Sequence, residues 1–212
     1  MGAVLRSQRP SSDKREAILA AALELFNERS FNGTPMPLVA QRAGVGAGTI
    51  YRYFDSKEAL GNAVFRACKT ALQSHLVASW RAELTPRDAF RALWRGLWEF
   101  FRDHPAAFQF LETHNHASYL DAESIATNEA MFTAIREFVG HGQSAGALRS
   151  GDPAVLIAMA FGAFIGLVKE SEAGRFELTE SVVLAAEELV WAMLTANNSP
   201  PRHRDTETDP AQ

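Results

Sequence analysis

Residues 43–60, AGVGAGTIYRYFDSKEAL, combine three glycines with aromatic and basic side chains in a spacing that suits contact with a nucleic-acid duplex. Glycine lets a backbone come close to another molecule, and the N–H groups at the start of a helix bind phosphate well. Arg52 and the hydroxyls of Tyr51 and Tyr53 can donate hydrogen bonds to bases and phosphates. The stretch therefore predicts a short helix that is presented to DNA.

The elements around this stretch must hold it outward. Two short helices, from about Thr34 to Ala43 and from about Gly48 to Phe54, are joined by a glycine-containing turn and match a helix-turn-helix. The second helix of such a motif enters the major groove. A longer helix precedes them, and we expect Asn32 and Gly33 to end it at a positive φ. One apolar face is predicted on that longer helix, formed by Ile18, Leu19, Ala22, Leu25 and Phe26, with Ile50 and Phe54 packing beside it.

The whole chain reads as helix. Amphipathic stretches continue to residue 197, and alternating runs typical of strands do not occur among them. We predict an all-α protein of about nine helices with an N-terminal helix-turn-helix domain and a larger C-terminal helical domain. The expected divisions are a flexible basic arm (1–12), a DNA-binding domain (13–60), a ligand-binding and dimerisation domain (61–197) and a disordered tail (198–212).

Charge and composition narrow the function. Residues 1–60 carry eight Lys or Arg and six Asp or Glu, whereas residues 61–212 carry thirteen and nineteen. A slightly basic head on an acidic body permits DNA binding. The single Cys68 fits a reducing compartment. The longest apolar run, Pro153 to Val168, is shorter than the roughly 20 residues that span a bilayer. We expect a cytoplasmic protein without a membrane partner.

A family resemblance rests on ILAAALELF (residues 18–26), on AGVGAGTIYRYFDSKEAL and on the spacing between them. These segments resemble the N-terminal module of TetR-type (TetR/AcrR) transcriptional regulators. The resemblance implies three DNA-binding helices followed by a helical domain that dimerises and binds a small molecule. It places DNA contacts at Thr34, Met36, Gly46, Ala47, Gly48, Thr49, Tyr51, Arg52, Tyr53 and Lys57.

Three positions depart from the family pattern. Ser30 stands where the pattern usually has Gly, Pro35 where it has Ser or Thr, and Gly46 where it has Ser. The last two changes remove hydroxyls that would contact phosphate. The basic arm at Arg6 to Arg9 could compensate by reaching the DNA backbone or minor groove.

The C-terminal half suggests a ligand site less directly. A cavity lined by aromatic side chains and Met is what an apolar or aromatic, largely uncharged effector needs. The candidates are Trp94, Trp98, Phe101, Phe110, His114, His116, Tyr119 and Met131, and a filled core is the alternative for each aromatic ring. For the two histidines a ligand role and a purely structural role both remain open. Two residues apart on a helix they would point away from each other, so no metal is expected, and no cofactor is implied.

Small residues at short intervals near the C-terminus indicate close helix packing. Gly162 and Gly166 are four residues apart, a spacing that lets two backbones approach. We expect a two-fold dimer in which two helices from each subunit form a four-helix bundle, with packing inside one subunit as the alternative. The predicted interface residues are Gly162, Ala163, Gly166, Ala186 and Trp191.

These features predict a homodimeric, ligand-responsive transcriptional regulator that binds a palindromic double-stranded operator. Repression relieved by the small molecule is the expected mode. The motifs of common enzyme classes do not occur in the sequence, so catalysis is not expected. The alternative is a helical small-molecule-binding protein without DNA binding.

Overall fold

The computed structural model describes residues 11–81, 83–113 and 115–195. These residues form nine helices and no strand, which confirms the all-α prediction. The chain divides into two compact units, residues 1–133 and 134–212, and the basic arm up to residue 10 and the whole tail from residue 198 lie outside the described residues. The helices are α1 (Ser11–Arg29), α2 (Met36–Arg42), α3 (Ala47–Ile50), α4 (Lys57–Ala78), α5 (Pro86–Asp103), α6 (Pro105–Thr113), α7 (Ala122–Ser144), α8 (Pro153–Glu172) and α9 (Glu180–Thr195).

The end of α1 differs from the prediction. Ser30, directly after the helix, has a φ of 62°, whereas Asn32 and Gly33 do not adopt positive φ. The left-handed region is the usual way to end a helix and normally takes glycine. Gly33 serves a different purpose, because a Cβ there would overlap the carbonyl oxygen of Arg29. The sequence placed the turn two residues too late.

The two short helices α2 and α3 differ in how well the sequence predicted their ends. Gly44 ends α2 at a φ of 66°, as predicted, whereas α3 is only one turn long and ends at Ile50 instead of continuing to Phe54. The hydroxyl of Ser56 accepts the N–H of Ala59 at 3.0 Å and starts α4. Because this cap makes α4 begin at Lys57, the residues between the end of α3 and Ser56 form a turn and do not continue α3. Ile50 and Phe54 are buried, as expected.

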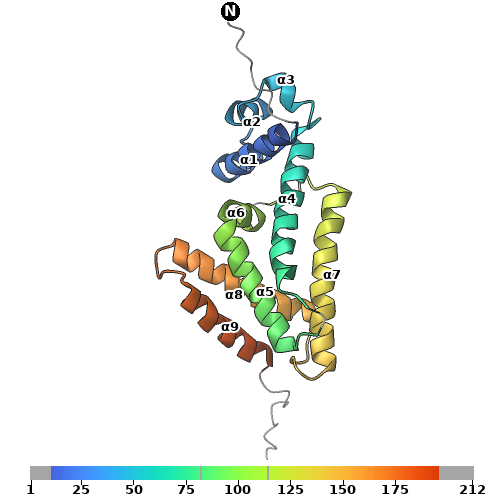
Figure 1. The fold of residues 1–212 in the computed structure, drawn as a ribbon, viewed down its shortest axis with the longest axis vertical. Coiled ribbons are helices and arrows are strands. Elements are labelled where there is room, and N and C mark those ends of the chain that lie inside the picture. Colours follow the sequence, from blue (N-terminus) through green and yellow to red (C-terminus); the bar gives the residue numbers. More distant parts are fainter. Residues whose placement is uncertain (1–10, 82, 114, 196–212) are drawn as a thin grey trace, which may run out of the picture. The chain divides into compact units, whose positions relative to one another are not determined.

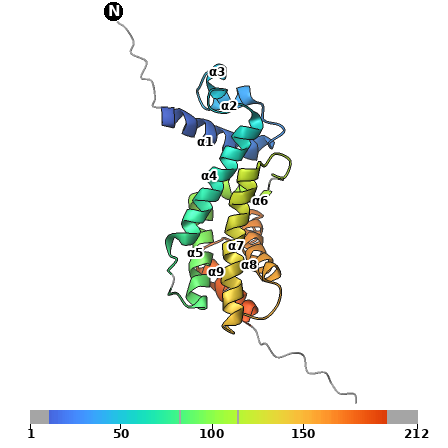
Figure 2. The same cartoon turned by 90° about the vertical axis from the view of Figure 1, so that its right-hand side faces the viewer.

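Within the first unit, α1, α2 and α3 gather at the start of α4, and α5 packs along α4 (Figure 1). The two long helices approach closely at Gly96, where a Cβ would lie 2.7 Å from the carbonyl oxygen of His75. Helix α6 joins α1 through a hydrogen bond of 2.8 Å from the Asn27 side chain to the carbonyl of Ala106. Figure 2 shows α1 crossing the first turns of α4.

The second unit contains the end of α7 together with α8 and α9, which pack against each other. Asp152 caps α8 through the N–H of Ala154 at 2.8 Å. The N–H of Arg149 donates to the carbonyl of Leu194 at 2.9 Å and ties the loop before α8 to the end of α9. By length and composition alone, α8 could cross a membrane, whereas its apolar run from Pro153 to Val168 is shorter than the length expected for a span. A single helix of this kind is weak evidence for a membrane span.

Candidate DNA-binding surface and effector region

The turn before α3 and its first residues form an open surface. Gly46, Ala47 and Gly48 are exposed and Thr49 is half-buried. A Cβ at Gly48 would meet no atom within 4 Å, so the described protein itself does not require glycine there. Tyr51 keeps 49% of its surface accessible, an unusual exposure for a large aromatic residue. The backbone and side chains of this turn are therefore available to another molecule.

Two predicted DNA contacts do not lie on this surface. Thr34 is fully buried, and its hydroxyl lies 3.1 Å from the carbonyl oxygen of Leu25 and 2.9 Å from that of Ser30. The hydroxyl is thus used within the protein, against backbone carbonyls at the end of α1 and directly after it. Met36 is 6% exposed and belongs to the core. Both side chains are covered within the protein, and their contact with DNA stays a prediction.

The cations of this module differ in their surroundings. Arg52 is exposed and forms no ion pair within the part of the chain that the structure describes. Lys57 is half-buried, with Nζ 4.6 Å from the centroid of the Phe31 ring, and Tyr53 is half-buried. Arg52 is therefore the predicted cation most available to bases.

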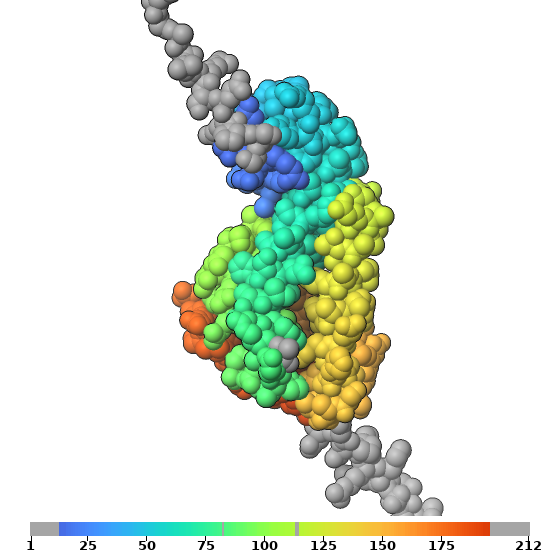
Figure 3. Space-filling view, turned by 45° about the vertical axis from the view of Figure 1, so that its right-hand side comes forward, coloured from blue at the N-terminus to red at the C-terminus, as the bar shows by residue number. Residues whose placement is uncertain are grey.

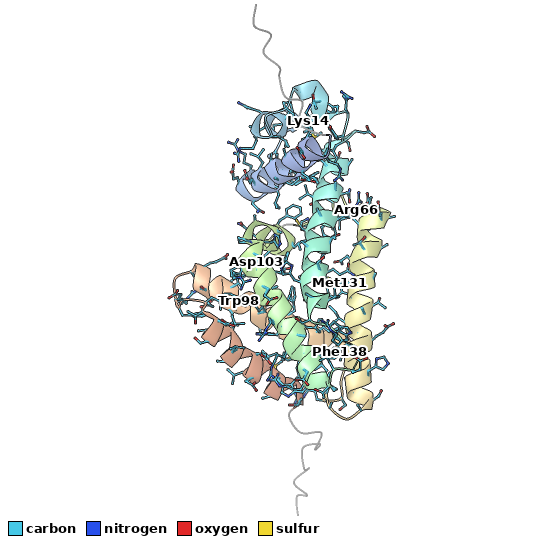
Figure 4. All side chains as sticks on the ribbon, viewed as in Figure 1. Lys14, Arg66, Trp98, Asp103, Met131 and Phe138 are labelled. Carbon is cyan, nitrogen blue, oxygen red and sulfur yellow. The ribbon has the colours of Figure 1, made fainter. Side chains whose placement is uncertain are left out.

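Two cations near the start of α1 were not predicted as contacts. Lys14 lies on the side of the module where α3 lies (Figure 4). The guanidinium of Arg15 lies 5.5 Å from the centroid of the Phe54 ring, which follows α3. Adjacent basic residues at the first turn of the helix were the available signal, because they follow Arg6 and Arg9 in the sequence.

An ion-pair group fixes α2 on α1. Arg42 Nη1 lies 3.0 Å from Glu24 Oε2 and 3.0 Å from Glu28 Oε1. The hydrogen bond from Arg42 lowers the pKa of Glu28. These groups are solvent-exposed, so their contribution to stability is small, but the two-pronged geometry sets the orientation of α2, and hence of the turn that leads to α3.

A second group of contacts joins the module to the loop between α6 and α7, and we call it the junction cluster: Phe31, Gly61, Asn62, His116, Tyr119 and Asp121. The Phe31 and Tyr119 rings stack with centroids 4.1 Å apart. Asn62 donates to the carbonyl of Tyr119 at 2.8 Å and accepts the N–H of Asp121 at 2.9 Å. A Cβ at Gly61 would lie 2.8 Å from the Phe31 ring. The cluster is tightly packed and its central polar groups are paired.

The predicted effector residues are spread over several places. Phe110 stacks on Phe26 of α1 with centroids 6.0 Å apart, so it belongs to the core beside the DNA-binding module. Trp94 is buried against Phe90. Trp98 and Phe101 are half-buried neighbours on α5. Met131 lies on α7 and is half-buried (Figure 4).

The histidine prediction needs correction in one respect. Helix α6 ends at Thr113, so His116 and Tyr119 lie in the following loop rather than on a helix. His116 is buried, its Nδ1 is paired with the Tyr119 hydroxyl, and its Nε2 lies 3.0 Å from the carbonyl oxygen of Phe110. Both ring nitrogens thus have protein partners, which favours the structural role for His116. His114 lies outside the described residues.

Comparison with known proteins identifies the class. Residues 18–64 match the family described as bacterial regulatory proteins, tetR family, and residues 65–196 match the family described as tetracyclin repressor-like, C-terminal domain. The chain therefore belongs to the TetR family of bacterial regulatory proteins.

Three relatives illustrate the likeness. The HTH-type transcriptional regulator RutR of Escherichia coli (strain K12) is 37% identical over 102 residues, which are 48% of each protein, so the chain spans about half the length of this curated relative. The uncharacterized HTH-type transcriptional regulator YhgD of Bacillus subtilis (strain 168) is 25% identical over 182 residues, 79% of this chain and 95% of that one. A solved TetR family regulator from Marinobacter aquaeolei VT8 superposes with a TM-score of 0.77 at 26% identity and covers 86% of this chain and 96% of its own.

Proposed function

We propose that the protein is a cytoplasmic, homodimeric repressor of transcription that binds a palindromic operator through α3 and is released from it by a small molecule. The observation that carries the proposal is the exposed turn at Gly46–Gly48 beside an unpaired Arg52, within the part of the chain that the structure describes. Gly46, Ala47, Gly48, Thr49, Tyr51, Arg52, Tyr53 and Lys57 remain the proposed contacts. The DNA-binding domain is proposed to comprise residues 13–60, and the ligand-binding and dimerisation domain residues 61–197.

The dimer is supported by the exposed faces of the last two helices. On α8 the exposed residues Val155, Ala158, Met159 and Gly162 recur at helical spacing, and α9 repeats the pattern with Ala185, Leu189 and Ala192. Leu189 alone keeps 73% of its surface accessible. Apolar faces of this kind mark interaction sites on water-soluble proteins.

The glycine pair on α8 bears on the alternative of packing within one subunit. A Cβ at Gly162 or at Gly166 would meet no atom within 4 Å among the described residues. Neither glycine is therefore needed for a close approach inside the chain. A second copy of the same two helices is the occupant that the symmetry of most oligomers favours, and it also accounts for the apolar character of α8 without a bilayer.

DNA binding is tested by fluorescence anisotropy with a labelled duplex from the region beside the protein's own gene. Two variants are compared. Arg52→Ala removes an arginine side chain directly after α3, and the control Arg95→Ala removes one from an exposed position on α5. We expect Arg52→Ala to weaken binding by about 1–3 kcal/mol and Arg95→Ala to leave it unchanged. No binding of any such duplex at low salt would contradict the proposal and favour the alternative of a ligand-binding protein.

The dimer is tested separately by light scattering after size-exclusion chromatography. Leu189→Glu puts a charge on the exposed face of α9, and Ala130→Glu puts one on an exposed position of α7. We expect only Leu189→Glu to shift the mass toward that of one chain. A wild-type protein that runs as a monomer at micromolar concentration would refute this part of the proposal.

A further inference from the structure

We infer that Lys69, on α4, recognises an anionic group of the effector, so that the effector is an apolar or aromatic organic anion. The inference rests on the proposed function only in naming the occupant as the effector. It adds one charge to the largely uncharged molecule that the aromatic residues alone suggest.

The first support is where the ammonium group lies. Lys69 is half-buried, and its Nζ lies 5.5 Å from the centroid of the Phe65 ring and 5.9 Å from that of Phe132. One ring belongs to α4 and the other to the first part of α7. Both distances are close to the limit of about 6 Å at which an aromatic face stabilises a cation. The rings therefore shield the ammonium group from water while stabilising it only weakly.

The second support is the lack of a partner for the charge. Within the described residues Lys69 has no ion pair or hydrogen bond of its side chain, and the charges of Glu112 and then of Cys68 act against the effect of burial. Burial lowers the pKa of Lys69 despite that carboxylate. A shielded cation without a close partner is costly, and a bound anion would remove the cost.

A neighbour on the same helix shows the contrast. Arg66 lies one turn before Lys69, and its Nη1 lies 3.0 Å from Asp121 Oδ2 and 3.3 Å from Glu123 Oε2. Figure 4 shows Arg66 directed toward the start of α7. Arg66 is therefore already neutralised by acidic side chains, whereas the next cation along α4 is not.

The surroundings of Lys69 set the rest of the ligand's chemistry. Three groups around Lys69 are apolar: Phe65 and Cys68 on α4 are buried, and Phe132 on α7 is half-buried. Figure 3 shows α4 and the first turns of α7 on the surface of the first unit. An apolar wall with one cation suits a ligand with an apolar or aromatic body and a single carboxylate or sulfonate.

The test uses two fluorescent probes that share their ring system. Anilinonaphthalenesulfonate carries a sulfonate, and phenylnaphthylamine is its uncharged counterpart. Binding of both is titrated with the full chain and with Lys69→Met, which keeps the length and apolar stem of the side chain. Lys69→Arg retains the charge, and Lys169→Met removes one from an exposed position on α8. Thermal unfolding of each variant verifies that it is folded.

We expect Lys69→Met to weaken sulfonate binding about tenfold or more, because it removes a charge-assisted contact with the sulfonate. Phenylnaphthylamine binding should change less than about twofold, and Lys69→Arg and Lys169→Met should behave like the wild type toward both probes. Equal loss of both probes in Lys69→Met, no loss of either, or no binding of the sulfonate to the wild type would overturn the inference. Operator affinity is measured separately, so a failure of DNA binding and a failure of anion recognition remain distinguishable.

Discussion

Asn62→Ala is the most informative single substitution in the junction cluster, because one side chain holds two segments distant in sequence. Asn62 is 3% exposed, and it bridges the carbonyl of Tyr119 and the N–H of Asp121 with hydrogen bonds of 2.8 and 2.9 Å. Alanine removes both bonds and leaves the two backbone groups without their partner. Each such bond contributes about 1 kcal/mol, and an unsatisfied buried group costs about 1–3 kcal/mol.

The expected loss of unfolding free energy is about 2–4 kcal/mol after the higher helix propensity of alanine is allowed for. For a chain of 212 residues this corresponds to a fall in Tm of about 5–15 °C. Thermal and urea unfolding followed by circular dichroism measure it. Asn128→Ala, at a half-buried position on α7, is the matched control and should change Tm little. A loss below about 1 kcal/mol in Asn62→Ala would refute the reasoning.

Three further predictions concern single groups. Ser30→Gly should raise the free energy of unfolding by about 0.5–1 kcal/mol, because Ser30 has a φ of 62° and only glycine adopts it without strain; urea unfolding that shows no gain would contradict this. Cys68 is buried, and burial raises its pKa to about 12, so a thiol reagent at pH 8 should label it in urea and hardly at all in the folded protein. The pKa of Asp121 lies below its ordinary value of 3.8, first because of the N–H and hydroxyl of Ser124 and then because of Arg66. Its contribution to stability should therefore be complete above pH 3.8 and disappear as the pH falls through the lower folded pKa, and an NMR titration midpoint at or above 3.8 would contradict the assignment.

The sequence predicted the helices well because their apolar spacing is strong. The buried face of α1, the glycine that ends α2 and the burial of Ile50 and Phe54 all follow from periodicity and turn chemistry. The length of α3 could not be predicted in this way. It depends on the Ser56 cap that starts α4. The sequence does not show whether α3 ends at Ile50 or a few residues later, because helix ends are uncertain by one or two residues.

The site was harder to predict, because exposure and pairing are properties of the folded chain. Thr34 has the hydroxyl of a DNA contact, yet it is buried against the carbonyls of Leu25 and Ser30. The sequence left a ligand role open for His116, whereas in the structure its ring nitrogens are paired with the Tyr119 hydroxyl and the carbonyl of Phe110. The sequence alone does not distinguish Lys69 from Arg66, because only the structure shows that Arg66 pairs with carboxylates and that Lys69 has no ion pair among the described residues.

The positions of Asn62 and Lys69 on α4 connect the two proposals physically. They are seven residues apart, which is about two turns or 10 Å along a helix and nearly the same face. Asn62 holds the junction cluster, which includes Phe31 of the DNA-binding module. A ligand can shift DNA binding only by as much as its affinity differs between two arrangements of the protein. An anion at Lys69 therefore regulates DNA binding only if the two arrangements place that ammonium group differently. Because a helix is a rigid element that can carry coupling between groups along it, we expect such a displacement of α4 at Lys69 to act on Asn62 and the contacts that it makes.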